Sequence, residues 1–254
     1  MTHSAPLVIG ATGGSGTRVL ARLARRAGYN LGAKLNSAED AMPFSPFHDA
    51  WINRFVKAEL SGGSLSTDEA AQMKKYFQRA LSSHLSGAAA QQSRWGWKAP
   101  RTIYLLPFLH DQFPDFKFIH LVRDGRDMAF SKNQNQLRKH GRAVLQWRER
   151  WFYVQPLRSI LLWERVNLMT ATYGETHLKN NYLRVRFEDL CGSPDETIGL
   201  IMNFLAAGID IRSAVREEIS RPSSIGRWGR RSPELVGRLE EAASISLRKF
   251  GYLD

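Results

Sequence analysis

The segment Phe116–Ser131 (FKFIHLVRDGRDMAFS) places an apolar run directly before a cluster of charge. The run ends at Val122 and is typical of a buried strand, and a helical pattern begins just behind Arg123-Asp-Gly-Arg126-Asp. A strand that passes straight into a helix is the repeating unit of a parallel sheet, whose strands need crossover connections. Both arginines would then lie at a strand's carboxyl end, beside helix N–H groups that favour anions. Arginine together with a hydroxyl such as that of Ser131 suits a phosphate monoester.

Strand and helix patterns alternate along the chain. This alternation predicts right-handed βαβ units, and therefore an α/β fold in three layers, with a central parallel sheet flanked by helices and a ligand at the strands' carboxyl ends. No repeat or long linker divides the sequence, so we expect one domain over residues 1–254. The predicted strands are Leu7–Ile9, Trp95–Lys98, Phe116–Val122 and Tyr182–Phe187. The predicted helices cover 17–27, 49–60, 67–86, 101–112, 124–136, 142–172, 194–205 and 233–250, with a loop at 87–93.

A glycine-rich loop follows the first strand. The run Gly13-Gly-Ser-Gly-Thr17 between a strand and a helix predicts backbone N–H groups aimed at a phosphate. It does not fit a Walker A loop, because Thr17 stands where that motif has lysine. The glycines at 10, 13 and 16 suit a dinucleotide-binding protein better. The following YNLGAKLNSAED, however, is a poor second strand for that fold, because Gly32 and Asn36 interrupt it.

The two loops together resemble those of sulfotransferases that use 3′-phosphoadenosine 5′-phosphosulfate (PAPS). Arg123 and Ser131, eight residues apart after an apolar strand, resemble the family's 3′-phosphate motif. Ser15-Gly16-Thr17-Arg18 resembles its 5′-phosphosulfate loop. The chain departs from the family at Gly14, where a lysine or arginine would neutralise charge on the bridging oxygen. The resemblance implies a P-loop sulfotransferase fold of the bacterial type.

Lys98 is the candidate to replace the missing loop cation. Trp97-Lys98-Ala99-Pro100 resembles the family's K-x-P segment, which places a lysine at the sulfuryl group. Segment 182–190 resembles a later family strand, and segment 223–228 resembles the loop that covers the nucleotide. The donor-binding residues that the resemblance implies are Gly13, Gly14, Ser15, Gly16, Thr17, Arg18, Arg123, Ser131, Arg227 and Trp228.

The acceptor's proton needs a base, and relatives carry it shortly after the first helix. Asp40 is our first candidate, because Leu35-Asn36-x-x-x-Asp40 resembles a bacterial sulfotransferase-like subgroup. Glu39 and His48 are the next candidates, and the other histidines are interpreted as structural. The predicted reaction moves a sulfuryl group from PAPS to a hydroxyl or amine of a small-molecule, glycan or lipid acceptor; it leaves adenosine 3′,5′-bisphosphate and calls for no metal ion. Two alternatives stay open, a nucleotide-binding protein of this fold with altered catalysis and an NAD(P)-binding Rossmann protein.

Composition narrows the class of partner. A net charge of +12 indicates an anionic partner, although the sequence shows no nucleic-acid-binding motif. No apolar run approaches the roughly 20 residues that span a bilayer, and the start of the chain lacks the pattern of a signal peptide, so we expect no stable membrane insertion. The single cysteine, Cys191, suits a reducing compartment, and we expect the cytoplasm. Nothing in the sequence indicates an oligomeric state.

Overall fold

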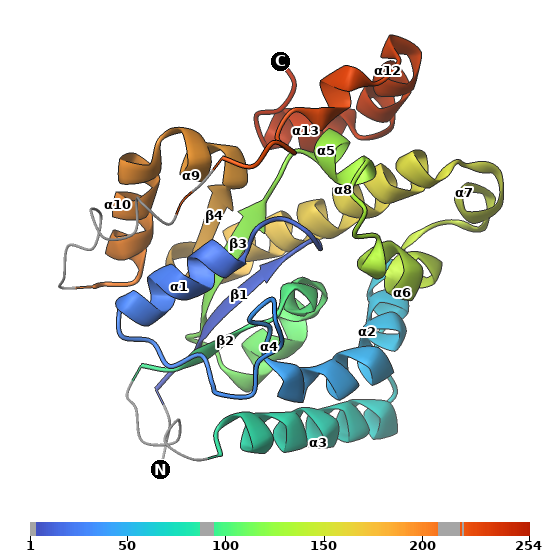
Figure 1. Cartoon of the computed structure of the whole chain (residues 1–254). Helices are drawn as coiled ribbons and strands as arrows, with labels where there is room; N and C mark the ends of the chain where they lie inside the picture. Colours follow the sequence, from blue (N-terminus) through green and yellow to red (C-terminus); the bar gives the residue numbers. More distant parts are fainter. Residues whose placement is uncertain (1–3, 87–93, 208–218, 220) are drawn as a thin grey trace.

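Four parallel strands form the centre of the molecule (Figure 1). The computed structural model describes residues 4–86, 94–207, 219 and 221–254, so the predicted loop at 87–93 lies outside the described residues. The strands pair in the order β2-β1-β3-β4, and every pairing is parallel. Their bounds are β1 Leu7–Ala11, β2 Gly96–Lys98, β3 Lys117–Val122 and β4 Tyr182–Arg186.

The register brings the functional loops to one edge of the sheet. Ile9 of β1 pairs with Lys98 of β2 on one side and with Ile119 of β3 on the other. Because the strands run in the same direction, the segments that follow them leave from the same edge. The loop after β1, the lysine that ends β2 and the arginine after β3 are therefore neighbours by topology.

The helices cover both faces of this sheet, as three-layer α/β packing requires. Along β1 the side chains alternate between the two faces. Leu7, Ile9 and Ala11 pack with the helices at 18–26, 187–192 and 194–204. Val8 packs with the helices at 45–60, 67–84 and 106–112 and with the turn at 100–105. The fold prediction of a parallel sheet flanked by helices is confirmed. The α-helices are α1 Arg18–Arg26, α2 Ser45–Leu60, α3 Thr67–His84, α4 Leu106–Gln112, α5 Gly125–Ala129, α6 Asn135–Val144, α7 Trp147–Phe152, α8 Gln155–Tyr173, α9 Phe187–Gly192, α10 Pro194–Phe204, α12 Pro233–Ala242 and α13 Ser244–Lys249. The other helical turns are η1 Met42–Phe44, η3 Pro100–Leu105, η4 Gly174–Leu178, η5 Lys179–Asn181 and η6 Arg227–Arg230.

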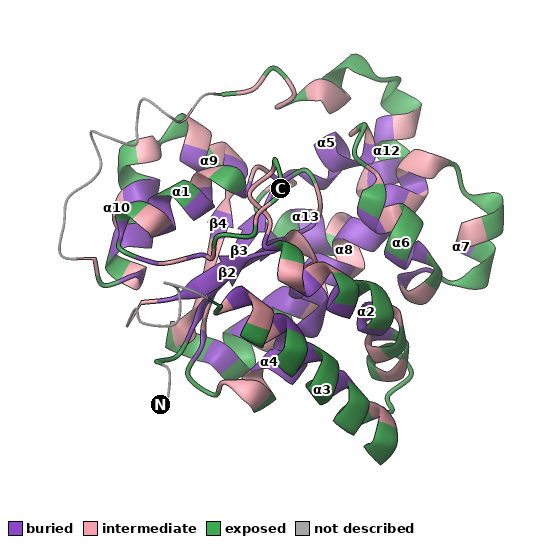
Figure 2. Ribbon diagram, turned by 60° about the horizontal axis from the view of Figure 1, so that its bottom comes forward, coloured by how far each residue is buried: buried purple, intermediate pink, exposed green. Residues whose placement is uncertain are grey.

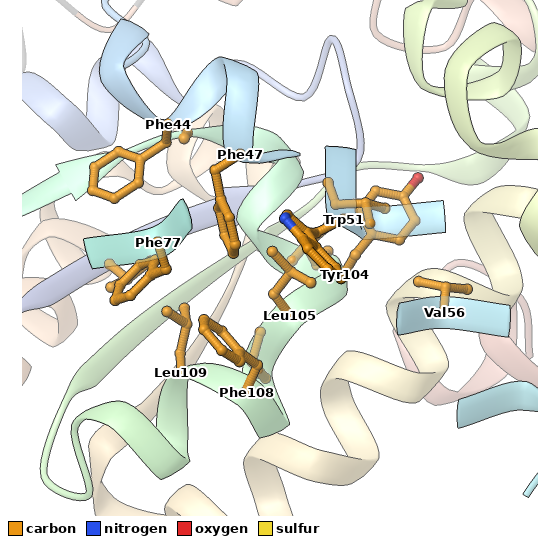
Figure 3. Close-up of a cluster of buried hydrophobic side chains, with 14 of the residues drawn as sticks. Phe44, Phe47, Trp51, Val56, Phe77, Tyr104, Leu105, Phe108 and Leu109 are labelled. Atoms are coloured by element: carbon orange, nitrogen blue, oxygen red, sulfur yellow. The ribbon is translucent and has the colours of Figure 1, made fainter. Parts of the chain in front are cut away.

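An aromatic core fixes α2 against the sheet (Figure 3). The Phe77 ring of α3 lies 5.3 Å from the Phe47 ring of α2, and also 5.3 Å from the Phe108 ring of α4. Phe44, just before α2, stacks on Trp97 of β2 at 4.7 Å. These contacts position the short segment ahead of α2, which carries Asp40. The strands and the helix faces that pack on them form the buried interior, which is purple in Figure 2.

Four predicted helices are divided in the structure, and α2 begins at Ser45, four residues before its predicted start. The one predicted at 101–112 begins as the 3₁₀ segment η3 and continues as α4. The helix predicted at 124–136 corresponds to α5 and only the start of α6, which continues to Val144. Those predicted at 142–172 and 233–250 are interrupted, which gives α7 and α8, and α12 and α13. Pro156 at the start of α8 explains one break, because proline lacks the N–H that a continuing helix needs. Among the described residues, no helix is long and apolar enough to cross a membrane.

Candidate active site

The loop after β1 has the shape of an anion cradle. Gly14 and Gly16 both adopt φ +87°, a conformation that residues with a side chain rarely adopt. A Cβ atom at Gly16 would also overlap the Phe187 ring, so glycine is required there. The Ser15 hydroxyl donates to the Thr12 carbonyl at 2.5 Å and closes the loop, and α1 begins at Arg18. Backbone N–H groups in such a loop before a helix favour a phosphate.

The backbone explains the missing cation of this loop. At Gly14 the space next to Cα is open, since a Cβ atom there would lie 3.5 Å from its nearest neighbours, on Met128 and Ser131. The positive φ, rather than crowding, therefore disfavours lysine or arginine at this position. A cation beside this loop therefore has to come from another element.

Lys98 places a buried ammonium group in the same cavity as the β1 loop. Its side chain is 2% exposed, and Nζ donates to Asp40 Oδ1 at 2.5 Å and to the Ala38 carbonyl at 2.6 Å. Burial lowers the pKa of Lys98 below its usual range, while the hydrogen bond and charge of Asp40 oppose that shift. Asp40 keeps the ammonium charged in a site that would otherwise disfavour charge.

Asn36, which was not among the predicted site residues, holds Asp40 in place. Asn36 Oδ1 accepts hydrogen bonds from the backbone N–H groups of Ala38 and Asp40, both at 2.9 Å. Its amide nitrogen also donates to Asp40 Oδ2 at 3.3 Å. The backbone N–H of Ala41 donates to the Lys98 carbonyl at 2.8 Å and ties this turn to β2. The Asn-x-x-x-Asp spacing was the available signal, because asparagine commonly closes turns of this kind.

The other two candidate bases have different surroundings. Glu39 faces α1, where Arg22 donates to it at 3.2 Å and Arg25 donates to it as well. Although partial burial raises the pKa of Glu39, these two arginines lower it overall. His48 is buried on α2, 3.4 Å from Thr102 Oγ1. Burial, and then the charge of Arg101, lower the pKa of His48 well below its usual range.

A cavity of about 670 Å³ connects these groups. Its wall contains the β1 loop, Lys98, Asp40 and His48, but not Glu39. The α6 side of the cavity was not predicted, because no local pattern indicates which helix will lie against the loop. There Gln136 donates to the Ala11 carbonyl at 3.1 Å and accepts from the Tyr104 hydroxyl at 3.0 Å. Further lining residues from that side are Asn133, Asn135 and Lys139. We call the 13–18 loop, Lys98 and Asp40 the phosphosulfate end of the site, after the group that the sequence resemblance leads us to expect there.

The second motif forms a separate group of cations. Arg123 is 4% exposed, and its Nη2 donates to Ser224 Oγ at 2.9 Å. Asp127 lies 3.6 Å from this guanidinium, and the Phe187 ring lies below it at 5.1 Å. Within the described part of the chain, the buried Nε of Arg123 has no hydrogen-bond partner. Ser131 lies next to Gly14, 3.5 Å from where a Cβ of that glycine would be, so the two sequence motifs meet in space.

Asp127 connects this group to the C-terminal segment. Its two carboxylate oxygens accept the backbone N–H groups of Gly226 at 2.9 Å and Trp228 at 3.3 Å. Arg227 beside them donates from Nε to the Ser224 carbonyl at 3.0 Å. Burial lowers the pKa of Arg227, and the nearby positive charge of Arg123 lowers it further. We call Arg123, Asp127, Ser131 and residues 224–228 the clamp end of the site.

Arg126 and Trp228 pack on each other. The Arg126 guanidinium lies 3.9 Å from the centre of the Trp228 ring. It also pairs with Asp124 at 2.9 Å and with Glu240 at 2.6 Å. Arg126 is thus occupied by its contacts with the C-terminal segment. Arg123 is therefore the arginine of the motif that belongs to the clamp end.

Comparison with known proteins identifies the family. Residues 6–210 match the model of the sulfotransferase family, which covers most of the chain, and the chain belongs to that family. No curated protein sequence matches it significantly. The dinucleotide-binding alternative is at odds with this membership. That alternative also needs a strand directly after the first helix, whereas residues 28–41 hold only isolated bridges before the 3₁₀ turn η1.

Solved structures share the fold at low sequence identity. The sulfotransferase domain of the Synechococcus PCC 7002 olefin synthase is 18% identical with a TM-score of 0.57, over 99% of this chain and 97% of that one. The sulfotransferase domain from the curacin biosynthetic pathway is 12% identical with a TM-score of 0.56, over the whole of both chains. Retinol dehydratase, solved with androsterone and the inactive cofactor PAP, is 15% identical with a TM-score of 0.51, over 97% of this chain and 82% of that one.

Proposed function

We propose that this protein transfers a sulfuryl group from PAPS to a hydroxyl or amine of an acceptor. The observation that carries the proposal is the buried Lys98 ammonium, which shares one cavity with the β1 phosphate loop and is paired with an acceptor-side carboxylate, Asp40. Sulfuryl transfer resembles phosphoryl transfer, in which catalysis is mostly positioning and stabilisation of charge. A buried cation at the reacting group and a base beside it are the two parts such a reaction needs.

The clamp end fits the 3′-phosphate of this donor. The buried Nε of Arg123 has no partner among the described residues. Burial, and then the charge of Arg123, lower the pKa of Arg227. Both features favour an added anion at this place. Retinol dehydratase, which shares the fold, was solved with PAP, and this supports a donor of the same type here. In our proposal Arg123, Ser131 and Arg227 hold the 3′-phosphate, while Gly13, Gly14, Ser15, Gly16, Thr17 and Arg18 hold the 5′-phosphosulfate. Trp228 would lie beside the adenine.

Each residue of the phosphosulfate end then has a defined task. PAPS supplies the sulfuryl group when it is bound. Lys98 stabilises the negative charge that develops on the bridging oxygen as the bond to the 5′-phosphate breaks, which replaces the cation missing at Gly14. Asp40 accepts the proton of the acceptor, and its hydrogen bond to Lys98 holds the two side chains next to each other. Asn36 orients Asp40 through the turn that it closes.

The acceptor would enter the same cavity from the side of α6 and α2. This wall is polar and basic, with Asn133, Asn135 and Lys139. A small molecule, a glycan or a lipid headgroup that carries a hydroxyl or amine fits such a wall, and we propose no nucleic-acid substrate. Because the chain has a single cysteine, we place the reaction in the cytoplasm.

The second candidate is a protein of the same fold that binds the nucleotide without transfer. Gly14 motivates it, because the loop itself offers no cation at the reacting group. The two candidates agree on nucleotide binding and differ on turnover.

The test measures both properties. Calorimetry should show adenosine 3′,5′-bisphosphate binding more tightly than AMP, NADP and ATP. Sulfur-35 transfer from labelled PAPS to a panel of hydroxyl and amine acceptors should then show turnover above that of Lys98→Ala. Equal affinities for adenosine 3′,5′-bisphosphate and AMP would reject the donor, whereas tight binding without any transfer would favour the second candidate.

A further inference from the structure

Helix α7 and the residues just after it expose an unusual amount of apolar surface. Trp151 is 79% exposed and Phe152 is 73% exposed. Trp147, Tyr153 and Val154 are exposed as well, so five large apolar side chains lie within eight residues. The Trp147 and Phe152 rings meet edge to face at 6.2 Å and form one external cluster. We call residues 147–154 the aromatic tip.

The tip is held firmly, so its exposure is a feature of the folded state. Glu149 is the buried residue of α7. It accepts two hydrogen bonds from Arg165 of α8, at 2.7 and 2.6 Å, and one from the Gln146 backbone N–H at 2.7 Å. Arg165 also donates to the Val144 carbonyl at 3.1 Å. This network fixes the helix with its aromatic side chains directed outward, so the backbone is already ordered when a partner arrives.

The sequence around the tip is strongly basic. Residues 128–163 contain seven lysines and arginines and only one acidic residue, Glu149, whose charge is buried and paired with Arg165. Arg148 adjoins the cluster directly, with its guanidinium 5.4 Å from the Trp147 ring. Six of them are Lys132, Arg138, Arg142, Arg148, Arg150 and Arg158, and the seventh, Lys139, pairs with Asp49 and lines the cavity of the candidate site.

The shape of this region favours a flat partner over a groove. Figures 1 and 2 both show α7 at the margin of the molecule, outside α6 and α8. A convex tip that carries tryptophan, phenylalanine and tyrosine can enter the boundary between headgroups and acyl chains, where such rings are favoured. The arginines around it would stay at the level of anionic headgroups.

We propose that the aromatic tip binds the protein peripherally to an anionic lipid surface. The charge of the surrounding segment selects anionic over neutral headgroups, and the tip supplies the apolar contact. Neither aromatic residues nor arginines alone would hold the protein stably, because membrane attachment of this kind needs two signals together. The proposal concerns a surface distinct from the donor site and does not depend on sulfuryl transfer.

The experiment is co-sedimentation of the full chain with two kinds of vesicle, one of phosphatidylcholine alone and one of equal phosphatidylcholine and phosphatidylglycerol. A protein with a net charge of +12 can adsorb to anionic vesicles by charge alone, so the decisive variant leaves the charge unchanged. Trp151→Ser with Phe152→Ser should weaken binding to the anionic vesicles on the order of tenfold. Arg148→Gln should weaken it roughly fivefold, as expected for one charge near the surface.

The matched control is Leu200→Ser with Ile245→Ser, which removes two exposed apolar side chains far from α7 in the sequence. It should bind the vesicles like the unchanged protein. Equal binding by the tip variant and the control would overturn the proposal, and so would tight binding to neutral vesicles. A native dimer that becomes a monomer in the tip variant would also overturn it, because a second copy of the chain would then cover the tip. Thermal unfolding of each variant checks that its fold is intact.

Discussion

The two ends of the candidate site are constructed differently. At the phosphosulfate end, the cation Lys98 is paired with a carboxylate at 2.5 Å, and adjacent parallel strands position it next to the loop. At the clamp end, Arg123 is held by Ser224 and Asp127, more loosely by the latter at 3.6 Å, and keeps a buried nitrogen without a partner among the described residues. At the first end a lysine and a carboxylate are closely paired, whereas at the second the guanidinium contacts its carboxylate loosely and Arg227 lies nearby.

This difference suggests a division of labour. A close lysine–carboxylate pair suits a step in which charge develops and a proton moves, because each group can respond to the other. A buried guanidinium with a nitrogen that has no partner among the described residues suits static binding of an anion. We therefore expect substitutions at the phosphosulfate end to change the rate and those at the clamp end to change affinity.

Lys98→Ala should produce the largest effect. Without the buried ammonium, charge on the leaving group is no longer stabilised, and turnover should fall by roughly 10²–10³-fold. Affinity for adenosine 3′,5′-bisphosphate should change little, because that product lacks the transferring group. Steady-state kinetics and calorimetry measure the two quantities. Arg18→Ala and Arg101→Ala are the comparison variants, and a larger loss in either would assign the cation to that residue instead.

Asp40→Asn should lower turnover by about 10²-fold while donor and acceptor still bind. The variant should also shift the alkaline limb of the pH–rate profile to lower pH. Asp40 raises the pKa of Lys98 against the effect of burial, so without the carboxylate Lys98 loses its proton at lower pH. Glu39→Gln is the matched control and should have a smaller effect, because Glu39 faces Arg22 and Arg25. Near-normal turnover in Asp40→Asn would reject Asp40 as the base.

Arg123→Gln should weaken binding of adenosine 3′,5′-bisphosphate by roughly 10–150-fold, the range expected for one lost charge-assisted clamp. AMP has no 3′-phosphate, so its affinity should hardly change. Competition calorimetry with both nucleotides separates a local effect from a general loss of the fold. An equal loss for both would mean that Arg123 acts through the C-terminal segment rather than on the phosphate.

His48 should have the smallest effect. Burial, and then the charge of Arg101, hold the pKa of His48 well below its usual range, so the imidazole stays neutral in the neutral pH range. We expect turnover without an inflection from His48 in that range, and a change of less than about threefold in His48→Gln. A neutral-range inflection that disappears in this variant would make His48 the base.

The sequence alone predicted the strands and the α/β fold of the molecule. Short apolar runs followed by helical patterns predicted all four strands, and the family match and the observed sheet confirm the fold. Glycines at 14 and 16, the lysine that ends β2 and Arg123 after β3 were visible because strand ends and turn residues are local signals. Their assigned roles stay predictions, which the variants above test.

Tertiary structure alone decided how these residues meet. The contact of Gly226 and Trp228 with Asp127 joins segments about a hundred residues apart, and no local pattern fixes such a pair. The pairing of Asp40 with Lys98 likewise depends on the aromatic core that places the segment before α2. Periodicity and turn chemistry act over a few residues, so the sequence determined the elements and their motifs. Packing of distant side chains acts over the whole chain, so only the folded molecule decided which cation is closely paired with a carboxylate and which, among the described residues, keeps an unused nitrogen.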